Sequence, residues 1–287
     1  MREELQKKVD RAIKLIQSAS KIAAANGCPE IEVCYSSGKD SDVILELTKM
    51  ADVPYRAIYK NTTIDPAGTI KHAQDMGSEI KRPQKTFFEL IKQKGFPSMF
   101  VRFCCSELKE YKILDYAIVG VRREESAKRM MRYKEPEMCR VFSKNVRARH
   151  YMPILDWTLR DIEEFIKERN IKCHPLYYDE KGNFHAERRL GCVACPLITP
   201  EKRIEQFKQH PNMVKAWIRN GAEYMRQHPN AKRVLYHDGD VYAWFVHELF
   251  YATKPREWET MNSNNSLFPP PNYKQFLEDY FKIKFSD

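Results

Sequence analysis

The segment IEVCYSSGKDSDVILEL, residues 31–47, decides the fold. Apolar side chains alternate along residues 31–35, as in a short β-strand. Residues 36–41 are small and polar, and residues 43–47 return to the apolar spacing of a helix. A strand, a loop of small residues and a helix form the opening unit of a parallel α/β sheet.

The same alternation recurs further along the chain. Tyr55–Tyr59 and Tyr116–Val121 each have the pattern of a strand, and the segment after Pro66 has that of a helix. We therefore expect an α/β fold with a doubly wound, mostly parallel sheet. In such sheets the ligand lies beyond the carboxyl ends of the strands. The small polar loop, NTTID (residues 61–65) and VRREES (residues 121–126) all follow predicted strands.

Helices are expected at both ends of the chain. Apolar residues at helical spacing over residues 5–16 predict an amphipathic helix. Thr158 is a candidate helix cap after the stretch PILDW, and Thr199, followed by Pro, marks another helix start before aromatic-rich helical stretches. We expect a nucleotide-binding α/β domain over residues 1–198 and a mainly helical region over residues 199–287.

Composition limits the class of protein. The 287 residues include 49 Lys and Arg against 39 Asp and Glu, a net charge of +10 that attracts polyanions without distinguishing nucleotides from nucleic acids. No apolar run approaches the roughly 20 residues of a membrane span, and the charged start is unlike a signal peptide. We expect a cytoplasmic protein without membrane contact. Its eight cysteines then favour ligand, nucleophile or core roles over disulfides.

The loop Ser36–Ser41 has the chemistry of a phosphate site. Unpaired N–H groups and the helix dipole favour an anion where a strand leads into a helix. Hydroxyls, a permissive glycine and a cation are supplied by Ser36, Ser37, Ser41, Gly38 and Lys39. Asp40 is costly beside phosphate, which assigns it to the helix start or to Mg²⁺. The alternative is an ordinary capped helix.

Three motifs resemble those of the PP-loop superfamily. SSGKDS resembles its S-G-G-K-D-S pyrophosphate loop, with Ser37 in place of one glycine. VGVRREESAKR, residues 119–129, resembles its G-x-R-x-x-x-S-x-x-R segment, and YMPILDWTLRDIEEFI, residues 151–166, resembles its P-[IL]-x-D-W-x-x-x-D-[IV] segment. The motifs occur in the family's order. The resemblance extends to the phosphoadenosine phosphosulfate (PAPS) reductase-like branch.

The resemblance implies an adenine nucleotide, either ATP or a phosphosulfate (APS or PAPS). It places Ser36–Ser41, Gly120 and Arg122 at the nucleotide, and Thr62 of NTTID near the adenosine. We assign catalytic roles to Lys39, Asp40, Arg122 and Arg129. Guanidinium groups suit phosphate or sulfate oxygens, and Lys39 with Mg²⁺ would stabilise the charge of leaving pyrophosphate.

Four cysteines form a candidate metal site. The adjacent pair Cys104 and Cys105 and the C-x-x-C pair Cys192 and Cys195 supply four thiolates, a set that suits an iron–sulfur cluster or zinc. Their CC…CxxC arrangement resembles the [4Fe–4S] ligand set of the adenosine phosphosulfate reductase branch, which favours the cluster. Cys139 is an alternative ligand or a separate thiol.

The resemblance fails at one point. Sulfonucleotide reductases resemble one another in an E-C-G-[LI]-H tail whose cysteine attacks the sulfate sulfur, and no cysteine follows Cys195 in this sequence. A reductase would need Cys139, Cys173 or a partner's thiol. We therefore expect ATP pyrophosphatase-type activation coupled to sulfur transfer.

The partners expected for this activity follow from charge and chemistry. The positive charge and an aromatic, basic C-terminal region would suit a nucleic-acid acceptor, and a sulfur-donor protein would supply the sulfur. The third alternative is a non-catalytic module that senses nucleotide or redox state. The sequence does not decide whether the chain forms oligomers.

Overall fold

The computed structural model describes residues 1–263 and 271–285. Contacts divide the chain into two compact units. The α/β unit comprises Met1–Asn61, Asp65–Pro83 and Leu108–Gly191, and the helical unit comprises Thr62–Ile64, Gln84–Glu107 and Cys192–Asp287. The domain boundary predicted after residue 198 stays a prediction. The two compact units do not follow this boundary, because Thr62–Ile64 and Gln84–Glu107 belong to the same unit as the C-terminal helices.

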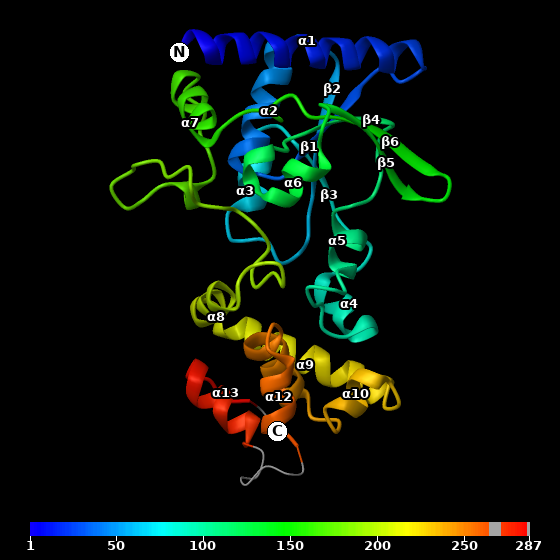
Figure 1. Ribbon diagram of the computed structural model, residues 1–287, viewed down its shortest axis with the longest axis vertical. Helices are drawn as coiled ribbons and strands as arrows, with labels where there is room; N and C mark the ends of the chain where they lie inside the picture. The colour runs from blue at the N-terminus through cyan, green and yellow to red at the C-terminus, as the bar shows by residue number, and fades with distance from the viewer. Residues whose placement is uncertain (264–270, 286–287) are drawn as a thin grey trace. The chain divides into compact units, whose positions relative to one another are not determined.

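The α/β unit contains a six-stranded sheet in the order β3-β2-β1-β4-β6-β5 (Figure 1). The strands are β1 (Ile31–Tyr35), β2 (Tyr55–Lys60), β3 (Glu79–Lys81), β4 (Tyr116–Val119), β5 (Glu137–Ser143) and β6 (Val146–Tyr151). All neighbours pair in parallel except β5 and β6, which form an antiparallel hairpin at the edge. The predicted mostly parallel, doubly wound sheet is confirmed.

Helices cover this sheet. They are α1 (Glu3–Ala25), α2 (Lys39–Met50), α3 (Thr69–Asp75), α6 (Ala127–Arg132) and α7 (Leu159–Glu168), with short 3-10 turns η1 (Arg123–Glu125) and η2 (Pro175–Tyr177). The predicted cap of α7 is confirmed. The Thr158 hydroxyl accepts a hydrogen bond from the Asp161 N–H at 3.2 Å, and the Asp161 carboxylate accepts one from the Thr158 N–H at 2.8 Å.

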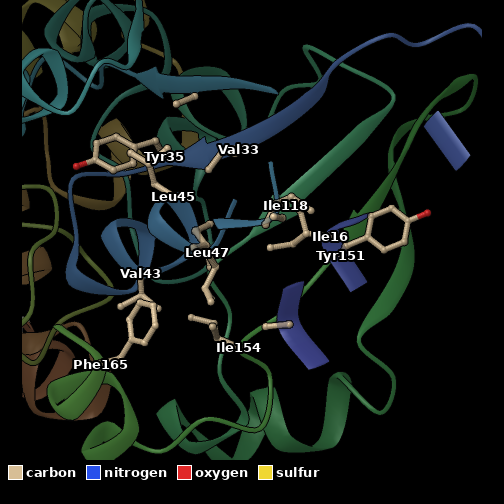
Figure 2. Packing of buried hydrophobic residues seen from close by; sticks show 14 of the residues in the cluster. Ile16, Val33, Tyr35, Val43, Leu45, Leu47, Ile118, Tyr151, Ile154 and Phe165 are labelled. Atoms are coloured by element: carbon tan, nitrogen blue, oxygen red, sulfur yellow. The ribbon is translucent and has the colours of Figure 1, made fainter. Parts of the chain in front are cut away.

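The hydrophobic core lies between these helices and the sheet (Figure 2). β1 is buried along almost its whole length, as expected for a central parallel strand covered on both faces. Figure 2 shows Val43 of α2 beside Phe165 of α7, and both side chains are fully buried. Full burial of one such side chain stabilises the fold by roughly 1.5–3 kcal/mol. This packing fixes the N-terminus of α2 relative to the strands.

The strand order places a topological switch between β1 and β4. From β1 the chain adds β2 and then β3 on one side, and it later returns to place β4 on the other side of β1. Ligands of open α/β sheets bind at such a switch, beyond the carboxyl ends of the strands. β1 leads into Ser36–Ser41 and β4 into Gly120–Arg122. The fold therefore brings two of the predicted motifs to its ligand-binding edge.

The helical unit is built around aromatic side chains. Its helices are α4 (Phe87–Lys94), most of α5 (Phe103–Leu108), α8 (Pro200–Gln209), α9 (Pro211–Gln227), α10 (Lys232–Tyr236), α11 (Val241–Val246), the π-helical turn η3 (His247–Tyr251), α12 (Pro255–Met261) and α13 (Tyr273–Phe281). Phe96 packs against Trp217 and Trp244, with ring centroids 5.5 and 4.3 Å away. Among the described residues, none of the helices combines the length and apolar character that a membrane crossing requires.

Candidate functional site

The loop between β1 and α2 is held in a specific conformation. Gly38 is the N-cap of α2, so the first N–H groups of the helix open toward the loop. Ser37 adopts a left-handed φ of 60°, which costs a non-glycine residue roughly 1–2 kcal/mol. Its buried hydroxyl donates to the Thr69 carbonyl at 3.1 Å, which fixes this geometry.

Lys39 is buried beside this helix start. Its Nζ lies 3.2 Å from an oxygen of Asp40 and 5.5 Å from the centre of the Tyr177 ring. The Tyr177 hydroxyl also accepts hydrogen bonds from the N–H groups of Lys39 and Leu190, at 3.2 and 3.3 Å. Burial raises the pKa of Tyr177 to about 12, so the phenol stays neutral. Tyr177 was not predicted, because an aromatic residue in PLYYD is equally typical of a core position.

Gly120 and Arg122 reach the loop from the end of β4. A Cβ atom on Gly120 would lie 3.1 Å from the Asp40 carbonyl oxygen, so the two backbones need glycine to approach this closely. Arg122 is 3 % exposed, and its Nε donates to Asp40 at 2.5 Å. Burial acts to lower the pKa of Arg122, but Asp40 and the neighbouring glutamates outweigh it and raise the pKa. The guanidinium is therefore a buried, charged group.

Arg129 does not contact Asp40 directly and is linked to Arg122 through Glu125. Its guanidinium pairs with Glu125, and Glu125 also accepts a hydrogen bond from the Arg122 N–H at 3.4 Å. Glu125 pairs with the exposed Arg189 as well, at 3.1 Å. The structure thus gathers the loop, Gly120 and Arg122 around Asp40, whereas Arg129 connects to them through Glu125.

Asp42 is a second acidic residue in this region that was not singled out from the sequence. It is fully buried, accepts a hydrogen bond from the Tyr35 hydroxyl at 2.5 Å, and lies 3.1 Å from the His72 Nε2. Burial raises its pKa. The available signal was a carboxylate within the otherwise apolar run of α2.

Thr62 belongs to the helical unit rather than to the unit of the loop. It is buried, and its hydroxyl accepts a hydrogen bond from the Cys192 thiol at 3.6 Å. Its predicted role near the adenosine stays a prediction.

The four predicted metal-ligating cysteines lie together in the helical unit. Cys104 and Cys105 are adjacent on α5, and a left-handed Ala194 with φ of 56° turns the chain between Cys192 and Cys195. A hydrogen bond with Cys105 raises the pKa of Cys104, burial raises it further, and Cys195 and Cys192 add to the effect. The thiols of Cys105, Cys195 and Cys192 therefore all lie near that of Cys104.

Their donor chemistry suits a soft metal or an iron–sulfur cluster. The four thiols are near one another, but their arrangement is not that of a metal site. In the described part of the chain, no three or more His, Cys, Asp or Glu side chains stand arranged to hold a metal ion.

A buried cation lies beside this cysteine group. The Arg203 Nε donates to the Ala194 carbonyl at 3.1 Å, and its Nη1 donates to the Glu248 carbonyl at 3.0 Å. Burial lowers the pKa of Arg203 to about 10, while Glu248, Cys195 and Cys104 oppose the change. The side chain stays charged at neutral pH, and its charge would offset that of bound thiolates.

The two alternative thiols, Cys139 and Cys173, belong to the α/β unit. Cys139 is exposed on β5. Cys173 is buried, and burial together with Asp42 raises its pKa well above the ordinary value. Cys173 therefore stays a protonated thiol, which is a poor nucleophile.

Comparisons with known proteins show which family the chain resembles. A family model described as phosphoadenosine phosphosulfate reductase domain matches residues 30–198. An uncharacterized 37.8 kDa protein of Escherichia phage 186 is 30% identical over 152 residues, covering 47% of this chain and 42% of that protein. Sulfate adenylyltransferase subunit 2 of Rhizobium tropici is 26% identical over 183 residues, covering 51% and 57%. The chain thus spans about half the length of these curated relatives.

The crystal structure of phosphoadenylyl-sulfate reductase from Candida auris is 16% identical and covers 64% of this chain and 97% of that chain, with a TM-score of 0.39.

Proposed function

Because the chain belongs to the phosphoadenosine phosphosulfate reductase domain family, we propose that its α/β unit binds ATP and activates an acceptor for sulfur transfer. The observation that carries this proposal is the convergence of two buried cations, Lys39 and Arg122, on the single carboxylate of Asp40 at the N-terminus of α2. Buried cations at a helix start attract phosphate. A carboxylate among them suits a metal-bound nucleotide better than a bare anion.

The loop residues would divide the work of nucleotide binding. The N–H groups at the start of α2, the Lys39 ammonium and the Arg122 guanidinium would hold the pyrophosphate oxygens. Asp40 would hold Mg²⁺, which in nucleotide sites takes one or two carboxylates together with phosphate oxygens. When bound, Mg²⁺ offsets the negative charge of the pyrophosphate. Asp40 would then exchange its present bonds to Lys39 and Arg122 for this role.

The reaction we propose has two displacements. An acceptor oxygen attacks the α-phosphorus of ATP, its bond to phosphorus forms, and the bond to pyrophosphate breaks. Sulfide (HS⁻), delivered by a sulfur donor, then attacks the carbon that bears the adenylated oxygen: the carbon–sulfur bond forms, the carbon–oxygen bond breaks, and AMP departs with that oxygen. Lys39 and Arg122 would stabilise the leaving pyrophosphate, and Arg129, released from Glu125, would add a second guanidinium.

The cysteine group would bind a [4Fe–4S] cluster through Cys104, Cys105, Cys192 and Cys195, with zinc as the alternative metal. Held by all four thiolates, a bound cluster would have no open iron and would act through its charge; held by only three of them, it would supply an open iron that accepts sulfur. The support from this chain is the proximity of four thiols and the buried, charged Arg203 next to them.

A sulfonucleotide reductase is the second candidate. The exposed thiol of Cys139 in the same unit as the phosphate loop favours it. The raised pKa of Cys173 argues against that residue as the nucleophile.

Equilibrium binding of Mg-ATP, APS and PAPS to the anaerobically purified protein tests the proposal. We expect a preference for ATP and a loss of at least about tenfold in ATP affinity for Lys39→Ala, since a charge-assisted hydrogen bond contributes about 1.5–3 kcal/mol. Lys49→Ala is the matched control, because Lys49 is exposed at the other end of α2. A preference for a phosphosulfate would instead support the reductase, and ATP binding without pyrophosphate release in the presence of acceptors would support a sensing module.

A further inference from the structure

The positive charge of the chain is concentrated in one segment of the α/β unit. Residues 126–149 contain eight Lys or Arg and two Glu, a formal charge of +6 out of +10 for the whole chain. Residues 199–287, which we expected to be basic, contain thirteen Lys or Arg and eleven Asp or Glu. Their formal charge is only +2. The segment 126–149 comprises α6 and the β5–β6 hairpin.

Most cations of this segment have no acidic partner. Arg129, Arg140 and Arg149 form ion pairs with glutamates. The five others are exposed, and within residues 1–263 and 271–285 none forms an ion pair. Lys128, Arg132 and Lys134 lie on or directly after α6, and Lys144 and Arg147 lie at the turn of the β5–β6 hairpin; these two groups are together called the basic surface below. Their charges are therefore available to a ligand.

Aromatic and apolar side chains alternate with these cations. The Arg132 guanidinium lies 5.4 Å from the centre of the Tyr133 ring, and that of Arg140 lies 5.8 Å from the Phe142 ring. Met131 and Val141 are 76% and 55% exposed. Arginine and aromatic planes beside exposed apolar groups are the surfaces on which unpaired bases stack.

Protection of the sheet edge is a simpler explanation, but it accounts for only some of these cations. β5 is the edge strand of the sheet, and lysine at a sheet edge protects it against pairing with other chains. Lys144 and Arg147 at the hairpin fit that role. Lys128 and Arg132 lie on α6, away from any strand edge, and Met131 beside them is an exposed apolar group that such protection would not favour.

We propose that the basic surface binds a single-stranded segment of nucleic acid. The proposal rests on the proposed function, because it makes that strand the acceptor of the activated sulfur transfer. Five unpaired cations would contact backbone phosphates, and Tyr133, Phe142 and Met131 would pack against bases. The apolar groups favour a single strand over a duplex, whose bases are stacked away from such contacts.

The test compares two variants of equal charge change in the full-length protein. The first is Lys128→Gln, Arg132→Gln, Lys144→Gln and Arg147→Gln combined. The control is Lys202→Gln, Lys215→Gln, Arg219→Gln and Lys232→Gln combined, four exposed residues of the helical unit. Binding of labelled oligo-U, oligo-dT, a duplex DNA of equal length and, as a polyanion without bases, polyglutamate is measured between 50 and 200 mM salt. Thermal unfolding checks that both variants fold.

We expect the wild type and the control to bind the single strands, and the first variant to bind at least tenfold more weakly. The slope of log affinity against log salt should fall by up to about 3 units, since each phosphate contact with a single strand contributes about 0.7. The oligo-U and oligo-dT arms distinguish RNA from DNA. Stronger binding to the duplex, equal loss in both variants, or equally tight binding of polyglutamate would overturn the proposal.

Mg-ATP binding is measured on the same samples. None of the four substituted residues belongs to the nucleotide loop, so ATP affinity should stay unchanged in the first variant. A wild type that does not bind ATP would refute the proposed function, whereas a wild type that binds ATP but no nucleic acid would refute only this inference.

Discussion

The Nε of Arg122 donates a hydrogen bond to the carboxylate of Asp40 at 2.5 Å, which joins the segment after β4 to the first turn of α2. The Arg122 side chain is 4% exposed and that of Asp40 is 18% exposed. Two motifs that lie more than 80 residues apart in the sequence are therefore coupled by one largely buried ion pair. The electrostatic balance of the loop depends on this contact.

Removing one partner of this pair should cost stability. Arg122→Gln leaves Asp40 with only Lys39 as a charged partner, and Asp40→Asn leaves Arg122 with Glu124. We expect each to lower the free energy of unfolding by about 2–4 kcal/mol, since breaking a buried pair leaves an uncompensated charge. The double variant should lose less than the sum of the two, by about 1–3 kcal/mol. Urea unfolding of all four proteins measures this coupling, and strict additivity would mean that the pair contributes nothing.

The close approach of Gly120 to Asp40 leads to a second prediction. In Gly120→Ala the new Cβ would lie 3.1 Å from the Asp40 carbonyl oxygen, so the loop must move. We expect a loss of about 1–3 kcal/mol of stability from overpacking, and weaker Mg-ATP binding in isothermal titration. Gly191→Ala is the control, because no atom lies within 4 Å of its added Cβ. Equal ATP affinity in both variants would show that the loop tolerates displacement.

The sequence predicted the sheet well because the signals were local. Alternating apolar residues over 31–35 and the cap at Thr158 are short-range patterns that the packing reinforces. The edge hairpin of β5 and β6 was not predicted. Its charged, half-exposed strands lack the apolar alternation that marks a buried strand.

For the candidate site, the sequence indicated which motif and which kinds of residue take part, but not the contacts between distant parts of the chain. The hexapeptide at Ser36–Ser41 predicted a phosphate loop, but Tyr177 contacts Lys39, and His72 contacts Asp42 of α2, across 30 or more residues. Contacts between residues so far apart produce no periodic pattern in the sequence from which they could be predicted. The assignment of Thr62 to the helical unit had no signal either, because NTTID directly follows a predicted strand.

Metal content should depend on four cysteines and not on a fifth. Serine substitution at Cys104, Cys105, Cys192 or Cys195 should reduce bound iron and acid-labile sulfide to less than half, because each removes one thiolate ligand. Cys139→Ser should leave both unchanged. Anaerobic purification with iron, zinc and sulfide analysis measures this, and a visible absorption spectrum reports the cluster. Zinc without sulfide would replace the cluster by a zinc site, and iron loss in Cys139→Ser would change the ligand set.

Stability should fall in mild acid partly because of His150 on β6. Burial, and then the charge of Arg140, lower the pKa of His150 to about 4, whereas an unfolded histidine titrates near 6.5. Between these values the unfolded chain binds the proton more tightly, so the contribution of neutral His150 is complete above pH 6.5 and is lost as the pH falls toward 4.

We expect this residue alone to lower the free energy of unfolding by about 2 kcal/mol at pH 5 relative to pH 7.5. His150→Gln should remove that part of the pH dependence. Other buried histidines act with the same sign: burial lowers the pKa of His237 to about 3. The test is therefore the difference between the wild type and the variant in how much the free energy of unfolding falls from pH 7.5 to pH 5. Urea unfolding at both pH values measures it, and parallel losses in the two proteins would mean that His150 titrates as an exposed side chain does.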